Sequence, residues 1–536
     1  MSDKLDKSKR VAGLFAILIT VFITIIITVM PVIGETIVEK DEPRAVSTEA
    51  LSCRFGTTAW SSAQGEKLAE LGAGWYLNFG SNFISTAPAN SEFVPMVRLK
   101  QDKIGDDIYL DDYSVSPPLT DSGLGAKIDA HPGVTWVIGN EPDRGPGEGS
   151  SGQDDMMPAM YARALHDVAE YIKDRDPTAK IAAAGLVQIT PGRLQYLDIM
   201  AEVYYTTYNE PLPVDVWTMH IYIMPEVRPD GSVNSLASVA LGTDPALGMK
   251  ESGGDSSLCN NVNNNVYCFS DHDNMDFFER QVRDMRTWMK AHGQQNKPLL
   301  ITEYSILYTY KWEDGTCFLD EFGQCFTPER VSNYLRNTFD FVSGNNNMTD
   351  VNIGYPQDEN RLVQQVMWWS LNAGHYPGKV SNLYNDDLIE LTVVGSAFKS
   401  EIAERTLIPN LFAHNATSAP GFIIAPATTA TVTLSVDVYN NGNTAVTVPI
   451  TATFYNNAAM TPANVIGSTS VPNLDGCARS PVSVNMSWSG LTSGAHRYWV
   501  KVDSDNALNE SDEGDNIISG IVLVDPYQNF LPSIRR

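Results

Sequence analysis

Positive charge is scarce in this sequence. Its 37 lysines and arginines are outnumbered by 64 aspartates and glutamates, which gives a formal net charge of -27. Nucleic acids and anionic membrane surfaces attract proteins with an excess of basic residues, so we expect no nucleic-acid partner. A Gly-rich phosphate loop after the first predicted strand is also missing, which counts against a nucleotide-binding open sheet. The sequence predicts neither a cofactor nor a catalytic metal.

Cysteine is also rare, with six residues in the chain. Cys259 and Cys268 lie in one Asn-, Gly- and Ser-rich stretch, and Cys317 and Cys325 lie in another loop-like stretch. Such local pairs in an extracellular protein predict disulfides that staple loops. Zinc is the alternative, although zinc sites favour a shorter C-x2–4-C spacing. The remaining two cysteines are Cys53 and Cys477. They lie far apart in the sequence, which leaves their state open, with free thiols as one interpretation.

One long apolar run stands near the N-terminus, from Val11 to Met30, and it contains no charged residue. Roughly 20 apolar residues suffice for a helix to cross a bilayer. Basic residues precede the run and acidic residues follow it, so the positive-inside rule places the N-terminus in the cytoplasm. A cleaved signal peptide is the alternative, but it usually has a shorter apolar core and a small-residue cleavage site. We predict an uncleaved anchor in 1–35 and a linker in 36–51, with everything after it outside the cell membrane.

Residues 52–410 alternate strand-like runs that are apolar on both faces with helix-like runs. The predicted strands are 54–60, 74–80, 93–100, 134–140, 180–188, 214–223, 297–306 and 361–371. The predicted helices are 63–71, 125–130, 158–175, 194–205, 275–292, 328–342 and 395–404. This order is typical of a (β/α)8 TIM barrel, an α/β fold. An open doubly wound sheet is the alternative fold.

Two other regions depart from the barrel pattern. The insertion 224–274 is rich in Gly, Asn and Ser and follows the sixth strand, so we expect it on the active-site face as a substrate-shaping loop or a lid. In 418–526, apolar and polar residues alternate in strand-like runs separated by turn residues. This pattern predicts a small all-β sandwich of the Ig type. Its expected strands are 431–439, 446–454, 482–488, 496–502 and 517–524.

Two glutamates stand where a barrel enzyme keeps its reactive groups, at the carboxyl ends of strands. Glu141 follows the fourth predicted strand in an Asn-Glu-Pro-Asp run, and Glu303 ends the seventh. These strands face each other across a barrel, so both carboxylates can approach over its mouth. Glycoside hydrolysis needs such a pair. A glutamate at a helix start can instead simply stabilise the helix dipole, but two at matching strand ends favour catalysis.

Several motifs resemble the clan A glycoside hydrolases, most closely the glycosyl-hydrolase catalytic-core group around family 128. They are Trp75–Phe79, Phe93–Met96, Gly139–Asp143, His220–Tyr222 and Thr302–Tyr304. The resemblance covers about residues 52–405. It implies a retaining mechanism in which Glu141 is the general acid/base and Glu303 the nucleophile.

The resemblance also implies roles in substrate binding. Asn140 is expected to hydrogen-bond the sugar 2-hydroxyl, and Asn78, at the end of the second strand, is a weaker candidate. His220 and Tyr222 are expected to line the same subsite, with Tyr222 orienting the nucleophile. Because these two residues alternate on one strand, filling the barrel interior is their alternative role. Trp369 is expected to stack on a sugar face.

Two tryptophans follow one another at the end of the eighth strand. One of Trp368 and Trp369 must face outward and pack on helices, and we predict Trp368. The chain departs from the family pattern at Tyr304, where relatives often carry Phe-Gly, and in its longer sixth loop. Both departures leave the substrate open.

The acidic, Asn-rich run 503–516 precedes the last strand of the predicted sandwich and resembles the CARDB adhesion-related module. That resemblance implies a spacer or a weak glycan- or protein-binding unit. Calcium binding is one interpretation of such a run, and a solvated turn is the other.

Three functional hypotheses follow. The first is a retaining glycosidase that acts outside the cell on β-linked polysaccharide, with an endo-β-1,3-glucanase as its leading form. The second is another clan A specificity, of the xylosidase, mannanase or galactanase type. The third is a non-catalytic surface adhesin on the same barrel, which the presence of both carboxylates counts against.

Overall fold

The computed structural model describes residues 50–105, 108–145, 152–234, 237–311, 315–343, 348–374, 378–424 and 429–525. The predicted membrane helix lies outside these ranges. Within them, no helix is both long and apolar enough to cross a membrane. Contacts divide the chain into Met1–Ala45 and Val46–Arg536, so the barrel and the sandwich belong to the same unit.

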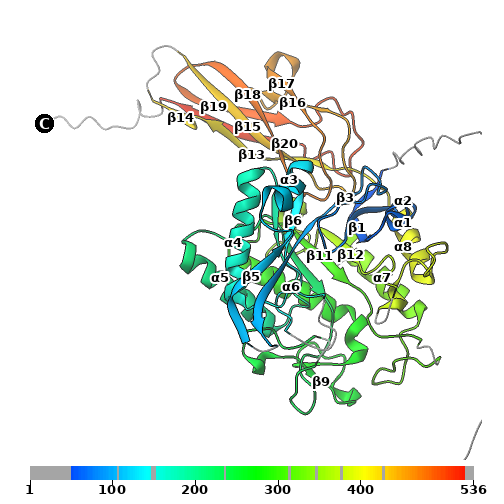
Figure 1. Cartoon of the computed structure of the whole chain (residues 1–536). Helices are drawn as coiled ribbons and strands as arrows, with labels where there is room; N and C mark the ends of the chain where they lie inside the picture. Colours follow the sequence, from blue (N-terminus) through cyan, green and yellow to red (C-terminus); the bar gives the residue numbers. More distant parts are fainter. Residues whose placement is uncertain are drawn as a thin grey trace, which may run out of the picture. The chain divides into compact units, whose positions relative to one another are not determined.

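Eight parallel strand positions, called staves below, close into a barrel, as predicted (Figure 1). A bridge between Ala182 and Val216 joins β7 to β8, and β3 runs on into β4. These two segments form one stave, which Pro95 interrupts because proline has no N–H to donate. The barrel strands are β1 (Ser52–Thr58), β2 (Ala73–Leu77), β3 (Glu92–Phe93), β4 (Met96–Ile104), β6 (Thr135–Ile138), β7 (Lys180–Ala183), β8 (Trp217–Ile221), β11 (Leu299–Tyr304) and β12 (Gln365–Trp368).

Helices cover the outside of the staves. They are α1 (Ser62–Gly65), α2 (Lys67–Leu71), α3 (Ala126–Ala130), α4 (Pro158–Arg175), α5 (Pro191–Tyr208), α6 (Met275–Ala291), α7 (Pro328–Ser343) and α8 (Val393–Ala403). Helices α4, α6 and α7 are amphipathic: α4, for example, buries Tyr161, Leu165, Val168 and Ile172 on one face. The apolar stripes of these helices and the outer faces of the staves share one core.

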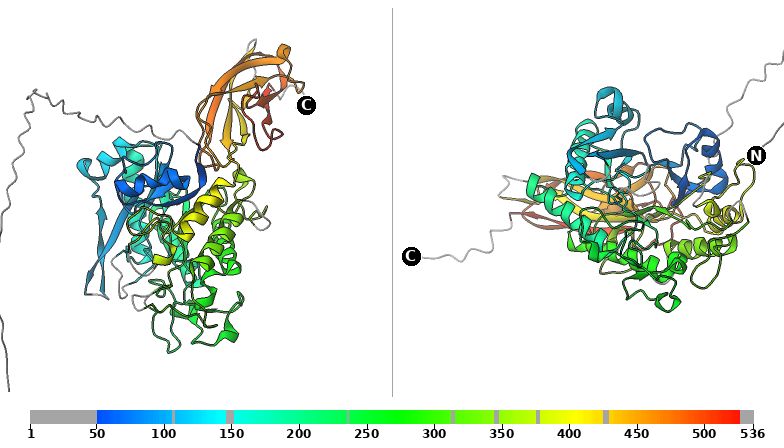
Figure 2. Two further views of the ribbon diagram at one scale, coloured as in Figure 1. Left: turned by 90° about the vertical axis from the view of Figure 1, so that its right-hand side faces the viewer. Right: turned by 60° about the horizontal axis from the view of Figure 1, so that its bottom comes forward.

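An antiparallel hairpin leaves the third stave and was not predicted. It consists of β4 and β5 (Ile108–Ser116) and projects from the barrel (Figure 2, left). The predicted strand ended at residue 100, but β4 continues to Ile104. In β5 the side chains are exposed or only half-buried, so the strand lacks the apolar periodicity by which sequence analysis finds strands.

The C-terminal domain is a sandwich of two sheets, as predicted. One sheet has the order β13-β15-β18 and the other β14-β20-β19-β16-β17. The strands are β13 (Leu411–Ala419), β14 (Phe422–Ile423), β15 (Ala430–Asn440), β16 (Ile450–Tyr455), β17 (Val465–Val471), β18 (Val482–Leu491), β19 (Gly494–Lys501) and β20 (Ile517–Val524). Strand pairing begins at Leu411, ahead of the expected start at 418, and the two inner faces form a separate core.

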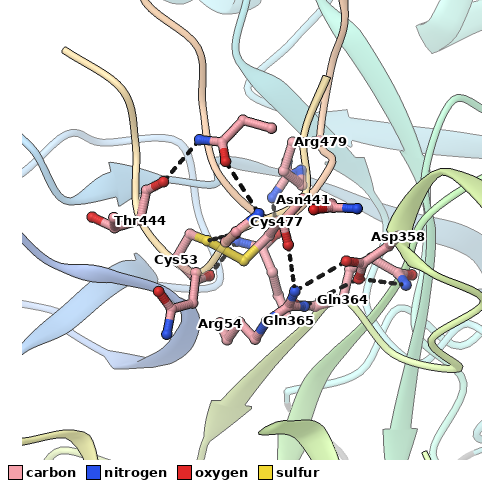
Figure 3. Close-up of a disulfide and its surroundings, with 12 residues drawn as sticks. Cys53, Arg54, Asp358, Gln364, Gln365, Asn441, Thr444, Cys477 and Arg479 are labelled. Carbon is pink, nitrogen blue, oxygen red and sulfur yellow. Dashed lines mark hydrogen bonds and ion pairs between the residues drawn. A yellow bond between two sulfur atoms is a disulfide. The ribbon is translucent and has the colours of Figure 1, made fainter. Parts of the chain in front are cut away.

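Cys53 and Cys477, whose state the sequence leaves open, are not free. They form a disulfide across 424 residues of sequence, with their Cα atoms 6.1 Å apart (Figure 3). Distance along the chain does not indicate this pairing, because the start of β1 lies against a loop of the sandwich. Arg54 reinforces this junction: it donates to both carboxylate oxygens of Asp358 at 3.1 and 3.0 Å and to the Asn441 carbonyl at 2.9 Å.

Arg479 of the sandwich reaches into the amino end of the barrel. Its guanidinium bonds Glu92 at 3.0 Å, Thr135 at 2.6 Å and the side chain of Gln365. These three partners are the first residues of β3, β6 and β12. The sandwich is therefore fastened to the amino end of the barrel, opposite the carboxyl ends of its parallel strands.

We expect loss of the long-range disulfide to destabilise the protein strongly. In a Cys53→Ser/Cys477→Ser double variant, the free energy of unfolding should fall by about 3–5 kcal/mol, because the bond closes a very long loop in the unfolded chain. Urea unfolding under non-reducing conditions measures the change. The matched control is Cys259→Ser/Cys268→Ser, whose loop spans a separation of 9 residues and whose loss should cost less. Equal losses in the two variants would contradict the prediction.

Candidate active site

Three barrel strands carry the central side chains. Glu141 follows β6, His220 lies near the end of β8, and Glu303 lies near the end of β11. Glu141 has a backbone φ of 45°, a left-handed conformation that is uncommon for residues other than glycine. Its N–H donates to the Gly185 carbonyl at 3.0 Å. Strained backbone of this kind is often concentrated at functional sites.

The two carboxylates meet over the barrel, with the imidazole beside them. One oxygen of Glu141, one oxygen of Glu303 and one nitrogen of His220 all lie within 4.8 Å of one another. His220 Nδ1 is 3.0 Å from Glu141 Oε1 and 3.8 Å from Glu303 Oε2. The side chains of Glu141 and Glu303 are 5% and 12% exposed, so the pair is shielded but Glu303 still reaches solvent.

A glycine makes room for the imidazole. A Cβ atom at Gly185 would lie 2.5 Å from the His220 ring, closer than real Cβ contacts come. Gly185 follows β7, between the strands that carry Glu141 and His220. Any side chain at this position would push the ring away from the carboxylates.

Polar neighbours hold the pair in place. The Tyr222 hydroxyl donates to Glu303 Oε1 at 2.7 Å. Asn140 is buried, and its amide nitrogen donates to the Gly152 carbonyl at 3.2 Å. Its amide oxygen has no hydrogen-bond partner among the described residues, so this buried acceptor is available to a ligand hydroxyl.

The pKa values of the two carboxylates shift in opposite directions. Burial raises the pKa of Glu303 to about 7, and the charge of Glu141 adds to the effect against the opposing influence of His220 and Tyr222. Burial also acts to raise the pKa of Glu141, but the hydrogen bond and charge of His220, with the charge of Arg144, hold it below its ordinary value. Below about pH 7 the pair therefore keeps one proton, and the opposite directions of the two pKa shifts place it on Glu303.

The tryptophans divide as predicted, with Trp368 facing outward. Its ring is fully buried against Tyr304, at 5.2 Å between ring centroids, and its indole N–H donates to the Ser381 carbonyl at 2.7 Å. Trp369 follows β12 and is only half-buried. Asn78 follows β2, but its amide is engaged in a turn with the Gly80 N–H and the Asn82 carbonyl.

A buried ionic network below Glu141 was missed by the sequence analysis. Arg193 of α5 is fully buried, and its Nε atom lies 2.7 Å from Asp143 Oδ2. The same guanidinium binds Glu226 and donates to the Ala237 carbonyl at 2.8 Å. Glu226 in turn accepts the Met249 N–H at 2.8 Å. Asp143 in the Asn-Glu-Pro-Asp run was a signal, because a carboxylate buried beside a catalytic one needs a cation.

Both local disulfides are confirmed. Cys259–Cys268 and Cys317–Cys325 have Cα separations of 5.5 and 5.8 Å. Glu321 lies close enough to the first pair that the three residues could form a cluster of metal ligands, but both sulfurs are joined in the disulfide bond. A zinc site, the alternative interpretation, is therefore not formed by these cysteines.

Further contacts tie the insertion to the neighbouring loop after β11. Glu321 accepts hydrogen bonds from Ser252 at 2.8 Å and from the backbone of Phe269 and Ser270 at 2.9 and 3.0 Å. Arg330 joins Asp273 and Asp320 at 2.6 and 2.7 Å. Of the two expected roles for the insertion, these contacts and the Arg193 network favour a fixed substrate-shaping wall over a lid.

The acidic side chains in 503–516 accept hydrogen bonds from nearby protein groups. Asp503 accepts the N–H groups of Ala507 and Leu508, and Asp515 accepts the Asn410 amide at 3.1 Å. In the described residues, groups of three or more possible metal ligands occur only at Glu141 and at the Cys259 disulfide. The geometry of this run thus matches the interpretation as a turn better than a calcium site.

Comparison with known proteins gives two resemblances. The CARDB family model matches residues 422–520. A search of curated proteins finds no match. A family 128 subgroup I endo-β-1,3-glucanase from Amycolatopsis mediterranei, solved with laminaritriose, is 15% identical and has a TM-score of 0.37; the alignment covers 65% of this chain and 99% of that one.

Two further solved structures are similar to parts of the chain. A curdlan-specific exo-β-1,3-glucanase of family 128 from Blastomyces gilchristii is 15% identical, with a TM-score of 0.35 and coverage of 65% of this chain and 97% of that one. A CARDB domain from Pyrococcus furiosus, with di-metal ions, is 18% identical, with a TM-score of 0.18 and coverage of 22% and 96%. The comparisons thus return the two groups that the sequence motifs resemble.

Proposed function

We propose that this protein is a retaining glycoside hydrolase that cleaves β-linked polysaccharide. The observation that carries the proposal is the meeting of Glu141 and Glu303 within 4.8 Å at the carboxyl ends of facing barrel strands. A short separation supports retention, because inverting enzymes keep their carboxyl groups about 6.5–9.5 Å apart to admit a water. The motifs that resemble family 128 make β-1,3-glucan the first substrate class to test.

The reaction proceeds in two steps. The ionised Glu303 attacks the anomeric carbon while the glycosidic bond breaks, and the leaving oxygen takes the proton of Glu141. Glu141, now ionised, then removes a proton from water, whose oxygen attacks the anomeric carbon and releases Glu303. Before the first step the shared proton must reside on Glu141. The opposite pKa shifts place that proton on Glu303 before substrate binds, so binding of the sugar must move it to Glu141 for the first step.

The neighbours support these roles. Tyr222 donates to the nucleophile and so orients it, and His220 bridges both carboxylates. The unpaired amide oxygen of Asn140 can accept the 2-hydroxyl of the sugar at the cleavage point. Trp369 offers a partly exposed ring at the end of β12 for stacking on that sugar.

We place this activity outside the cell, on an N-terminal membrane anchor. The support is the uncharged run from Val11 to Met30 with its basic flank. The three disulfides agree with this, because such bonds persist in oxidising compartments.

Substitution of the carboxylates tests the mechanism. In Glu303→Gln, kcat on β-glucan should fall roughly a thousandfold or more, because the amide cannot form the glycosyl-enzyme bond. In Glu141→Ala, added azide should restore turnover of an aryl β-glycoside, whose leaving group departs without acid assistance, and yield a β-glycosyl azide, since azide attacks the intermediate without a general base. Hydrolysis screens over β-glucans, xylans and mannans measure the loss in Glu303→Gln and identify the substrate class, and product analysis detects the glycosyl azide.

The matched control is Glu202→Gln, the same chemical change on an exposed residue of α5. It should hydrolyse as fast as the parent protein. A Glu303→Gln variant that retained full activity would refute the assignment of Glu303 as the nucleophile. A parent protein that is inactive on every polysaccharide would refute the hydrolase proposal and favour the hypothesis of a non-catalytic adhesin.

The shared proton predicts the pH profile. As pH rises through about 7, the pair loses its remaining proton, both carboxylates become charged, and kcat/KM should fall. In Tyr222→Phe the hydrogen bond that stabilises ionised Glu303 is lost, so the alkaline limb of the profile should move to higher pH and kcat should decrease. Steady-state kinetics over a pH series measures the shift. An unchanged alkaline limb in Tyr222→Phe would show that Glu303 does not set it.

A further inference from the structure

A second concave region lies at the carboxyl ends of β1 and β2, the barrel end that also carries Glu141 and Glu303. It is a pocket of about 360 Å³, within the range of small-ligand sites. Trp60, just beyond β1, and Asn78, just beyond β2, contribute to its wall. β1 pairs with β12, whose end carries Trp369, so the pocket adjoins the arc of strands around the proposed cleavage point.

The Trp60 ring is exposed yet held in position. It is 39% exposed and lies parallel to Phe79, with ring centroids 6.1 Å apart and an interplanar angle of 20°. Phe79 reaches this position through a left-handed backbone, with φ of 55°. The backbone N–H of Trp60 donates to the Gln64 side chain at 2.7 Å, and Gln64 donates to the Asn372 carbonyl of the loop after β12 at 3.1 Å. These hydrogen bonds hold the Trp60 backbone and the contact with Phe79 restricts the ring, so the residue loses little conformational entropy when a ligand covers it.

The remaining wall is polar but uncharged. It consists of three serines, two asparagines, Gly80, Phe83 and Ile84, and none of these residues is ionisable. In a chain with a net charge of -27, a pocket without charged lining stands out. A flat aromatic face with hydroxyl and amide groups around it is complementary to a neutral polyhydroxylated ring, which has an apolar face and hydroxyls at its edge.

We propose that this pocket is a saccharide-binding subsite in which Trp60 stacks on a pyranose ring of the polymer, away from the cleavage point. The inference rests on the proposed function, which supplies a polysaccharide that runs along this end of the barrel. It adds a residue, Trp60, that lies outside the motifs named above. Contact with Trp60 would increase the affinity for long polysaccharides.

Binding of laminarihexaose by the full-length chain tests the subsite. Titration calorimetry uses Glu303→Gln as the parent, so that binding proceeds without turnover. Adding Trp60→Ala should weaken the Kd about tenfold, whereas Trp60→Phe should keep most of the affinity because it keeps a ring. Adding Ser85→Trp should weaken binding as well, since it fills the pocket and leaves Trp60 in place. Tyr205→Ala is the matched control: this aromatic residue of α5 is 61% exposed and should not alter the Kd.

The outcomes separate this inference from the proposal beneath it. Loss of affinity in Trp60→Ala and Ser85→Trp, with none in Tyr205→Ala, supports the subsite. Unchanged affinity in the first two variants overturns the subsite and leaves the hydrolase proposal standing. Failure of the parent itself to bind laminarihexaose overturns the glucan substrate class together with the subsite.

Discussion

The site depends on keeping two negative side chains close together in a shielded place. Like charges at this distance repel strongly when water is largely excluded, so the surroundings must compensate. His220 lies between Glu141 and Glu303, Tyr222 donates to one, and Arg144 lies 3.9 Å from the other. The compensation is incomplete, and one proton therefore remains on the pair. The raised pKa of Glu303 and the lowered pKa of Glu141 place that proton on Glu303, so the proposed chemistry requires it to move to Glu141 before Glu141 acts as the acid.

A buried group of charged side chains next to Glu141 also stabilises the site. Asp143 lies two residues after Glu141 and, with Glu226 of the insertion, would leave two buried negative charges without Arg193. Removing one partner from such a network is costly, because the others remain buried without compensation. One guanidinium thereby ties the loop after β6 to the insertion after β8. The same interaction therefore links the insertion to the backbone next to Glu141, so a movement of the insertion would disturb Glu141.

Features of the structure that depend on local sequence patterns could be predicted, and features that depend on contacts between distant residues could not. The staves, the outward Trp368 and the ends of β6 and β11 follow from apolar periodicity and from the short Asn-Glu-Pro run. The Cys53–Cys477 bond does not, because nothing in the sequence indicates that residues 424 apart meet. Arg193 stands near the start of α5, and only the fold shows that its charge is buried. The hairpin strand β5 only half-buries Tyr113 and Val115 against the core and leaves Ile108 and Leu110 exposed, so its apolar residues do not mark one buried face.

The junction with the sandwich sets how the catalytic end is presented. Cys53 and Arg54 open β1, and the Leu51 carbonyl accepts a hydrogen bond from Thr444 at 3.2 Å. The chain therefore enters the described structure at the amino end of the barrel, where Arg479 also docks. Glu141 and Glu303 stand at the carboxyl ends of the barrel strands, so this attachment and the candidate site lie at opposite ends of the barrel. The Cys53–Cys477 bond and the Arg479 contacts therefore join the sandwich to the barrel through residues other than those that place Glu141 and Glu303.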